Sequence, residues 1–136
     1  MALRAQVDGA WTQAIPDVFS IRHTTVEAYL EPVVHEIKVS RADLLGDLKR
    51  PEKRAAYLAM ASQVYYVLGL NAKGLPLDDA DEVPAECGVM VATGEGLEIR
   101  RLAPKQPFSK LRFDVWMALA KSPPLHRESE KGQLLL

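Results

Sequence analysis

The clearest structural signal in the chain lies in the stretch Val33–Leu45, VVHEIKVSRADLL. Residues 33–39 are rich in β-branched side chains, which favour a β-strand. Because side chains alternate between the two faces of a strand, Val34, Glu36 and Lys38 share one face. We expect the apolar side chains of the other face to anchor the strand to a core. The two charged side chains would then stand together on the first face.

A helix is predicted directly after this strand. Ser40 belongs to the residue types that cap helix N-termini, and Asp43, three residues later, is a short-armed version of the capping box. The helical pattern continues to Pro51, which must begin a new helix or kink the old one. The residues from Glu52 onward are strong helix formers. Their predicted apolar stripe contains Ala55, Leu58 and Ala59.

The segments on either side complete a pattern of alternating strands and helices. Residues 1–15 are weakly helical, and a strand begins at Pro16. Downstream we expect a buried strand from Gln63 and a hairpin whose strands flank the GEG of residues 94–96. An amphipathic helix over 109–121 closes the pattern, with an apolar side formed by Leu111, Val115, Trp116 and Leu119. This order predicts an α/β fold in which a mixed sheet is covered by helices.

Length and charge limit the classes of protein to which the chain can belong. Its 136 residues fit one domain, which we place at 1–122, followed by a poorly ordered tail at 123–136. Seventeen basic and eighteen acidic residues argue against a polycationic nucleic-acid coat protein but permit a local basic groove. Charge is indeed uneven: cations gather between Lys38 and Arg54, whereas Asp78–Glu86 is acidic.

Cysteine content and hydropathy indicate the compartment. Cys87 is the only cysteine, so neither an intrachain disulfide nor a cysteine-based zinc site can form. The N-terminus lacks an apolar core of signal-peptide length, and no segment reaches the ~20 apolar residues of a membrane span. We therefore expect a cytoplasmic protein with no membrane partner.

Three charged residues suggest a site for chemistry. Asp17 opens the first predicted strand after Pro16, and Glu36 and Lys38 share a face of the next. If these strands pair, two carboxylates converge at one edge of the sheet beside an ammonium group. Hard divalent cations such as Mg²⁺ prefer oxygen ligands, usually one or two carboxylates, and the carbonyl of Ile37 would add another. Lys38 would orient water and stabilise charge on a phosphodiester.

The pattern of Pro16-Asp17 followed by Glu36-Ile37-Lys38 resembles the PD-(D/E)xK nuclease superfamily. The longer segments HEIKVSRADLLGDL, KRAAYLAMASQVYYVLG and VPAECGVMVATGEGLEIRRLA are similar to its small bacterial MmcB-like, DNA-repair-related branch. The resemblance covers roughly residues 16–103. It implies the restriction-endonuclease-like three-layer fold, with a central mixed sheet flanked by helices, and metal-dependent hydrolysis of DNA phosphodiester bonds.

The resemblance also implies roles for individual residues. Asp17 and Glu36 would be metal ligands together with Ile37, and Lys38 would position water. The cofactor would be Mg²⁺ or Mn²⁺ and the partner DNA, with a homodimer or DNA-repair partner proteins left open. The predicted substrate-binding residues are the hydroxyl and cations that follow the strand: Ser40, Arg41, Lys49, Arg50 and Lys53.

Other interpretations of these residues stay open. Glu36 and Lys38 would be an ordinary solvent-facing pair if the strand lay at an edge. Many superfamily members carry a glutamate on a helix before the PD strand, whereas this chain has none before Glu27. That difference leaves a catalytically inactive DNA-binding or assembly module as the alternative function. A plain interaction protein is a third option, with the Trp116 helix or the leucine-ended tail as its contact.

Overall fold

The computed structural model describes residues 3–7, 10–75, 77, 79–108 and 110–122. The tail predicted at 123–136 lies outside these residues. Five strands form one mixed sheet in the order β3-β4-β5-β6-β7. Their bounds are Val18–Ser20, Val33–Lys38, Gln63–Leu68, Gly88–Thr93 and Gly96–Arg101. The three central strands β4, β5 and β6 run parallel, and each edge strand pairs antiparallel with its neighbour.

The first two α-helices lie where the sequence places them, whereas the helix predicted over 109–121 begins only at Phe113. Helix α1 (Arg41–Leu48) begins after Ser40, whose Oγ accepts the backbone N–H of Asp43 at 3.1 Å, so the predicted cap is confirmed. Helix α2 (Pro51–Met60) begins at the proline itself. Helix α3 covers Phe113–Lys121, and the 3₁₀ turns η1 and η2 cover Glu27–Tyr29 and Ala80–Glu82.

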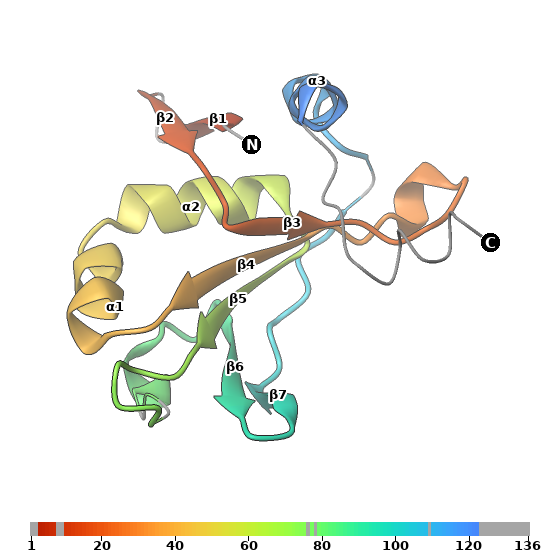
Figure 1. The fold of residues 1–136 in the computed structure, drawn as a ribbon. Helices are drawn as coiled ribbons and strands as arrows, with labels where there is room; N and C mark the ends of the chain where they lie inside the picture. The colour runs from red at the N-terminus through yellow and green to blue at the C-terminus, as the bar shows by residue number, and fades with distance from the viewer. Residues whose placement is uncertain (1–2, 8–9, 76, 78, 109, 123–136) are drawn as a thin grey trace.

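The N-terminal prediction is wrong. Instead of a weak helix, β1 (Leu3–Val7) and β2 (Ala10–Ala14) form a separate antiparallel pair with Val7 opposite Ala10. The sequence Asp-Gly between two short segments is a hairpin signal, which competes successfully with weak helix propensity. This pair lies against α2 on the side away from the five-stranded sheet (Figure 1).

The core lies between the sheet and helices α1 and α2 (Figure 1). Val34, Val64 and Tyr66 contribute from the sheet, and Leu44 and Tyr57 contribute from the helices. The buried side chains of α2 are Ala56, Tyr57 and Met60, so the predicted stripe of Ala55, Leu58 and Ala59 is wrong and lies nearer the other side of the helix. Trp116 is likewise exposed rather than on the buried side of α3.

The fold is thus α/β, with an open mixed sheet of five strands and three α-helices in the described residues. Both α1 and α2 pack on the sheet face that carries Val34, Glu36 and Lys38. The opposite face is more open, with Ile37 and Val39 exposed. No helix in the described part of the chain is long and apolar enough to cross a membrane.

Candidate functional site

Asp17 and Glu36 meet, as the sequence predicts. Asp17 immediately precedes β3, which pairs antiparallel with β4 so that Val18 lies opposite His35. The backbone N–H of Asp17 donates to Oε1 of Glu36 at 3.1 Å. In return the backbone N–H of Ile37 donates to Oδ2 of Asp17 at 2.8 Å. These two bonds hold both carboxylates at the junction of the two strands.

The two carboxylates differ in their access to solvent. Asp17 is exposed, whereas only 1% of Glu36 is accessible. Because the N–H and C=O of a strand residue point to the same side, the Ile37 carbonyl faces the same edge as Asp17. Asp17 and the Ile37 carbonyl therefore form the open side of the site, and Glu36 forms its buried side.

The alternation of side chains along β4 is confirmed, but the predicted burial is reversed. Val34, Glu36 and Lys38 are the buried residues of the strand, and Ile37 is exposed. The reason is tertiary: α1 and α2 cover the charged face and supply partners for its charges. A solvent-facing pair of Glu36 and Lys38 is therefore excluded, since only 6% of Lys38 is accessible.

Between β4 and the helices α1 and α2 lies a charge cluster, which we define as Glu36, Lys38, Asp47 and Lys53. The ammonium of Lys38 lies 3.6 Å from Oε2 of Glu36 and 3.5 Å from Oδ1 of Asp47. The ammonium of Lys53 contacts the same two oxygens at 3.3 and 2.9 Å. Two carboxylates and two ammonium groups thus neutralise each other in a region largely shielded from water.

Two tyrosines complete the surroundings of the cluster. The Tyr66 hydroxyl donates to Oδ2 of Asp47 at 2.5 Å, and the Tyr57 hydroxyl donates to the carbonyl of Ile15 at 3.0 Å. Burial raises the pKa of Tyr57, and the negative charge of Glu36 raises it further. Burial and the bond to Asp47 raise the pKa of Tyr66. Both hydroxyls therefore stay protonated and act as hydrogen-bond donors, Tyr66 to a carboxylate and Tyr57 to a backbone carbonyl.

The charges of the cluster also change the ionisation of its members. Burial raises the pKa of Asp47, but the hydrogen bonds from Tyr66 and Lys53 and the charge of Lys38 outweigh it, so the net pKa is lowered. Burial lowers the pKa of Lys53, but Asp47 and Glu36 outweigh it and the net pKa is raised. Both groups are therefore held in their charged forms.

The lowered pKa of Asp47 predicts acid sensitivity. Its ionised form contributes stability that is fully present above the unfolded pKa of about 3.9 and is lost as pH falls through the lower folded pKa. We expect the free energy of unfolding, measured by urea titration, to fall as pH drops from about 5 to about 2. In Asp47→Asn this decline should be shallower, and an identical decline in both proteins would contradict the assignment.

The predicted substrate-binding residues divide into two groups. Lys49 and Arg50 are exposed between α1 and α2. Lys53 instead points into the charge cluster, and the Ser40 hydroxyl caps α1. The Arg41 guanidinium pairs with Asp79 and with Glu82, the latter at 2.6 Å. The acidic segment that follows β5 therefore neutralises part of the basic stretch.

The sequence interpretation missed Asp47 and the inward position of Lys53. Asp47 follows Leu44 by three residues, on the side of α1 that faces the core. Lys53 precedes Tyr57 by four residues, on the buried side of α2, and its ammonium lies 5.7 Å from the centre of the Tyr57 ring. The signal that could have revealed the cluster is a charged residue on the core-facing side of each of two consecutive helices.

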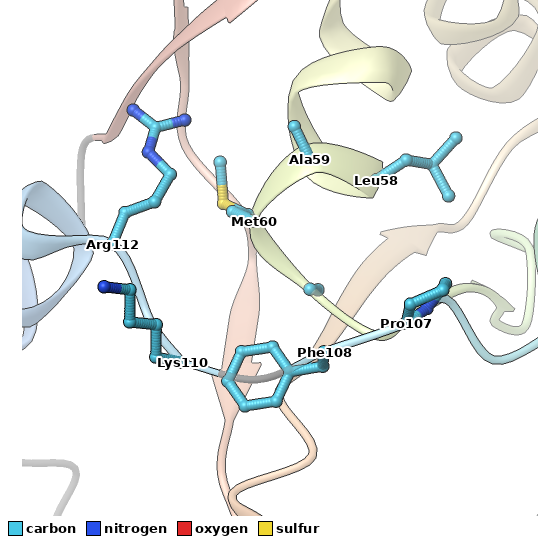
Figure 2. A pocket seen from close by; sticks show the side chains of 8 residues that line it. Leu58, Ala59, Met60, Pro107, Phe108, Lys110 and Arg112 are labelled. Atoms are coloured by element: carbon cyan, nitrogen blue, oxygen red, sulfur yellow. The ribbon is translucent and has the colours of Figure 1, made fainter. Parts of the chain in front are cut away.

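A cavity of about 160 Å³ lies elsewhere, at the C-terminal end of α2. Figure 2 shows Met60 and Phe108 beside it, with the cationic side chains of Lys110 and Arg112 on one side. None of the residues that line it is acidic. Because Lys53 lies near the opposite end of α2, this cavity is separate from the carboxylates.

Asp17, Glu36 and the Ile37 carbonyl match the ligand preferences of a hard divalent cation in chemical kind, because all three offer oxygen. Asp17 is accessible, but Oε1 of Glu36 already accepts a backbone N–H and Oε2 already contacts two ammonium groups. Within the described residues, no group of three or more His, Cys, Asp or Glu side chains is arranged to hold a metal.

Comparison with protein-family models, curated proteins and solved structures finds no match to this chain.

Proposed function

We propose that this protein is a metal-dependent nuclease of the PD-(D/E)xK type that hydrolyses DNA phosphodiester bonds in repair or processing. The observation that supports the proposal is the reciprocal pair of hydrogen bonds between Asp17 and the segment Glu36–Ile37. These bonds bring together the two acids of the PD…ExK pattern, which lie nineteen residues apart in sequence. The open mixed sheet and its helices are compatible with the three-layer fold of that superfamily.

In this proposal Asp17, Glu36 and the Ile37 carbonyl hold one Mg²⁺ or Mn²⁺ ion. When bound, the cation supplies Lewis-acid polarisation of the scissile phosphate. Asp17 presents its carboxylate at the accessible edge, where a DNA backbone can approach. Lys38 places a positive charge beside Glu36, where it orients water and stabilises the negative charge that develops on the phosphate. The exposed Lys49 and Arg50 contact neighbouring phosphates.

A cleavage assay tests the proposal directly. Purified protein is incubated with duplex, single-stranded and branched DNA, with Mg²⁺, with Mn²⁺ or with a chelator. We expect cleavage that depends on the added cation and is lost in Asp17→Asn, because the amide cannot replace the anionic ligand. Asp43→Asn is the matched control, since Asp43 is also exposed and lies outside the site. Cleavage that persists in Asp17→Asn would refute the assignment of the site.

A second candidate function is a non-catalytic DNA-binding or assembly module with the same fold. It is favoured by one observation: both ammonium groups of the charge cluster already neutralise Glu36. Calorimetry with Mg²⁺, combined with DNA binding at several salt concentrations, separates the two functions. Salt-sensitive DNA affinity without cation binding supports the module, whereas cation binding that requires Asp17 supports the nuclease.

A further inference from the structure

The two lysines of the charge cluster differ in their access to solvent. The side chain of Lys53 is 21% accessible, whereas that of Lys38 is only 8% accessible. Lys53 lies in the first turn of α2, three residues after the exposed Arg50. Of the two ammonium groups that contact Glu36, Lys53 therefore carries the one that a molecule outside the protein reaches more easily.

The ammonium of Lys53 also has a hydrogen-bond donor to spare. A lysine ammonium carries three N–H donors. Within the described residues, that of Lys53 donates to Oε2 of Glu36 at 3.3 Å and to Oδ1 of Asp47 at 2.9 Å. The centre of the Tyr57 ring lies 5.7 Å away, which suits a cation–π contact rather than a hydrogen bond. One N–H is thus available to a water molecule or a phosphate oxygen.

The carboxylate of Glu36 connects Lys53 to the open side of the site. Its Oε1 accepts the backbone N–H of Asp17, and its Oε2 contacts the Lys53 ammonium. A single carboxylate group therefore separates the Lys53 ammonium from the backbone of Asp17. A phosphate held at the accessible edge beside Asp17 lies close enough for a cation in this position to act on it.

We propose that Lys53 is a second catalytic cation, whose available N–H donates to a non-bridging oxygen of the scissile phosphate. The inference rests on the proposed function and extends it, because the sequence predicts Lys53 only as one of several phosphate contacts. Glu36 and Asp47 hold the ammonium in place, so it stabilises the negative charge that develops on the phosphate without first having to reorient. Lys53 keeps its proton throughout.

DNA binding without cleavage tests the contact. Fluorescence anisotropy with duplex DNA and a chelator, at several salt concentrations, gives the slope of log affinity against log salt. Each phosphate that a cation neutralises contributes about 0.9 to this slope. Lys53→Met should weaken binding and reduce the slope by about one, and Lys53→Arg should retain it. Lys38→Met should change the slope less, because it removes the same charge from a more shielded position.

Single-turnover cleavage with added cation tests the catalytic role. Lys53→Met should cleave about 10²–10³-fold more slowly at saturating protein, and Lys53→Arg should recover most of the rate. We expect Lys53→Met to fold, because the Lys38 ammonium still lies 3.6 and 3.5 Å from the two carboxylates. Circular dichroism checks the fold, and Lys73→Met controls for the loss of an exposed charge elsewhere.

The possible failures are distinguishable. A wild-type protein that cleaves no DNA with either cation would remove the proposed function and this inference together. If the wild type cleaves DNA, a Lys53→Met variant with an unchanged salt slope would overturn the role of Lys53 alone, whatever its rate. Equal changes of slope in Lys53→Met and Lys38→Met would also overturn it, since they would report charge lost from the cluster rather than a phosphate contact.

Discussion

Replacing Asp47 with asparagine is expected to lower the free energy of unfolding by about 3–5 kcal/mol, the typical cost of removing one partner from a buried ion pair. Only 3% of Asp47 is accessible, and its carboxylate contacts the ammonium groups of both Lys38 and Lys53. Asparagine has the same size and can still accept the hydrogen bond from Tyr66. The loss therefore reports the missing charge, which leaves the ammonium groups of Lys38 and Lys53 opposite Glu36 alone.

Urea unfolding monitored by circular dichroism measures this effect. Asp43→Asn is the matched control, because it makes the same chemical change on an exposed residue of α1 and should cost less than about 1 kcal/mol. The double variant Asp47→Asn/Lys53→Met removes one charge of each sign and should recover part of the loss. Equal stabilities of Asp47→Asn and Asp43→Asn would show that the charge cluster does not stabilise the fold.

Replacing Lys38 with methionine is expected to reduce the rate of cation-dependent DNA cleavage by about 10²–10³-fold, the usual effect of losing one preorganised electrostatic donor. The fold should survive, because methionine has a similar apolar stem and Lys53 still contacts both carboxylates at 3.3 and 2.9 Å. The expected loss is in kcat, since the ammonium acts on charge that develops during the reaction.

Single-turnover cleavage with saturating protein separates the chemical step from DNA binding, which fluorescence anisotropy measures in parallel. Lys73→Met serves as the control, because Lys73 is exposed in the loop after β5 and its change removes the same charge elsewhere. A Lys38→Met variant that cleaves at the wild-type rate would remove Lys38 from the mechanism. Weaker DNA binding with an unchanged single-turnover rate would assign it to binding instead.

The local elements were predictable because their signals are local. The β-branched run produced β4, the serine cap began α1, and Pro51 began α2. The hairpin around GEG also formed as expected. The N-terminal segment was mispredicted because a two-strand hairpin depends on pairing between its halves, which weak helix propensity does not reveal.

The candidate site was predictable only in part. The pattern of Asp17, Glu36 and Lys38 correctly implied that the residues Asp17 and Glu36 come together, and a backbone N–H of Asp17 does bind the Glu36 carboxylate. It could not show that Lys53 points inward. Which side of helix α2 faces the core depends on how the helix packs on the sheet, and that is a property of the tertiary structure. Nor could it show that Arg41 is paired with acids beyond β5, since Asp79 lies 38 residues away in sequence.

Periodicity and residue type were enough to establish that Glu36 and Lys38 share one face of a strand, because alternation is a property of the extended backbone itself. Whether that face meets water or the core depends on where the helices pack, and only the folded chain contains this information. Helices α1 and α2 cover the charged face, and their Asp47 and Lys53 complete its charge balance. Without those two partners, the burial of Glu36 and Lys38 would be prohibitively costly.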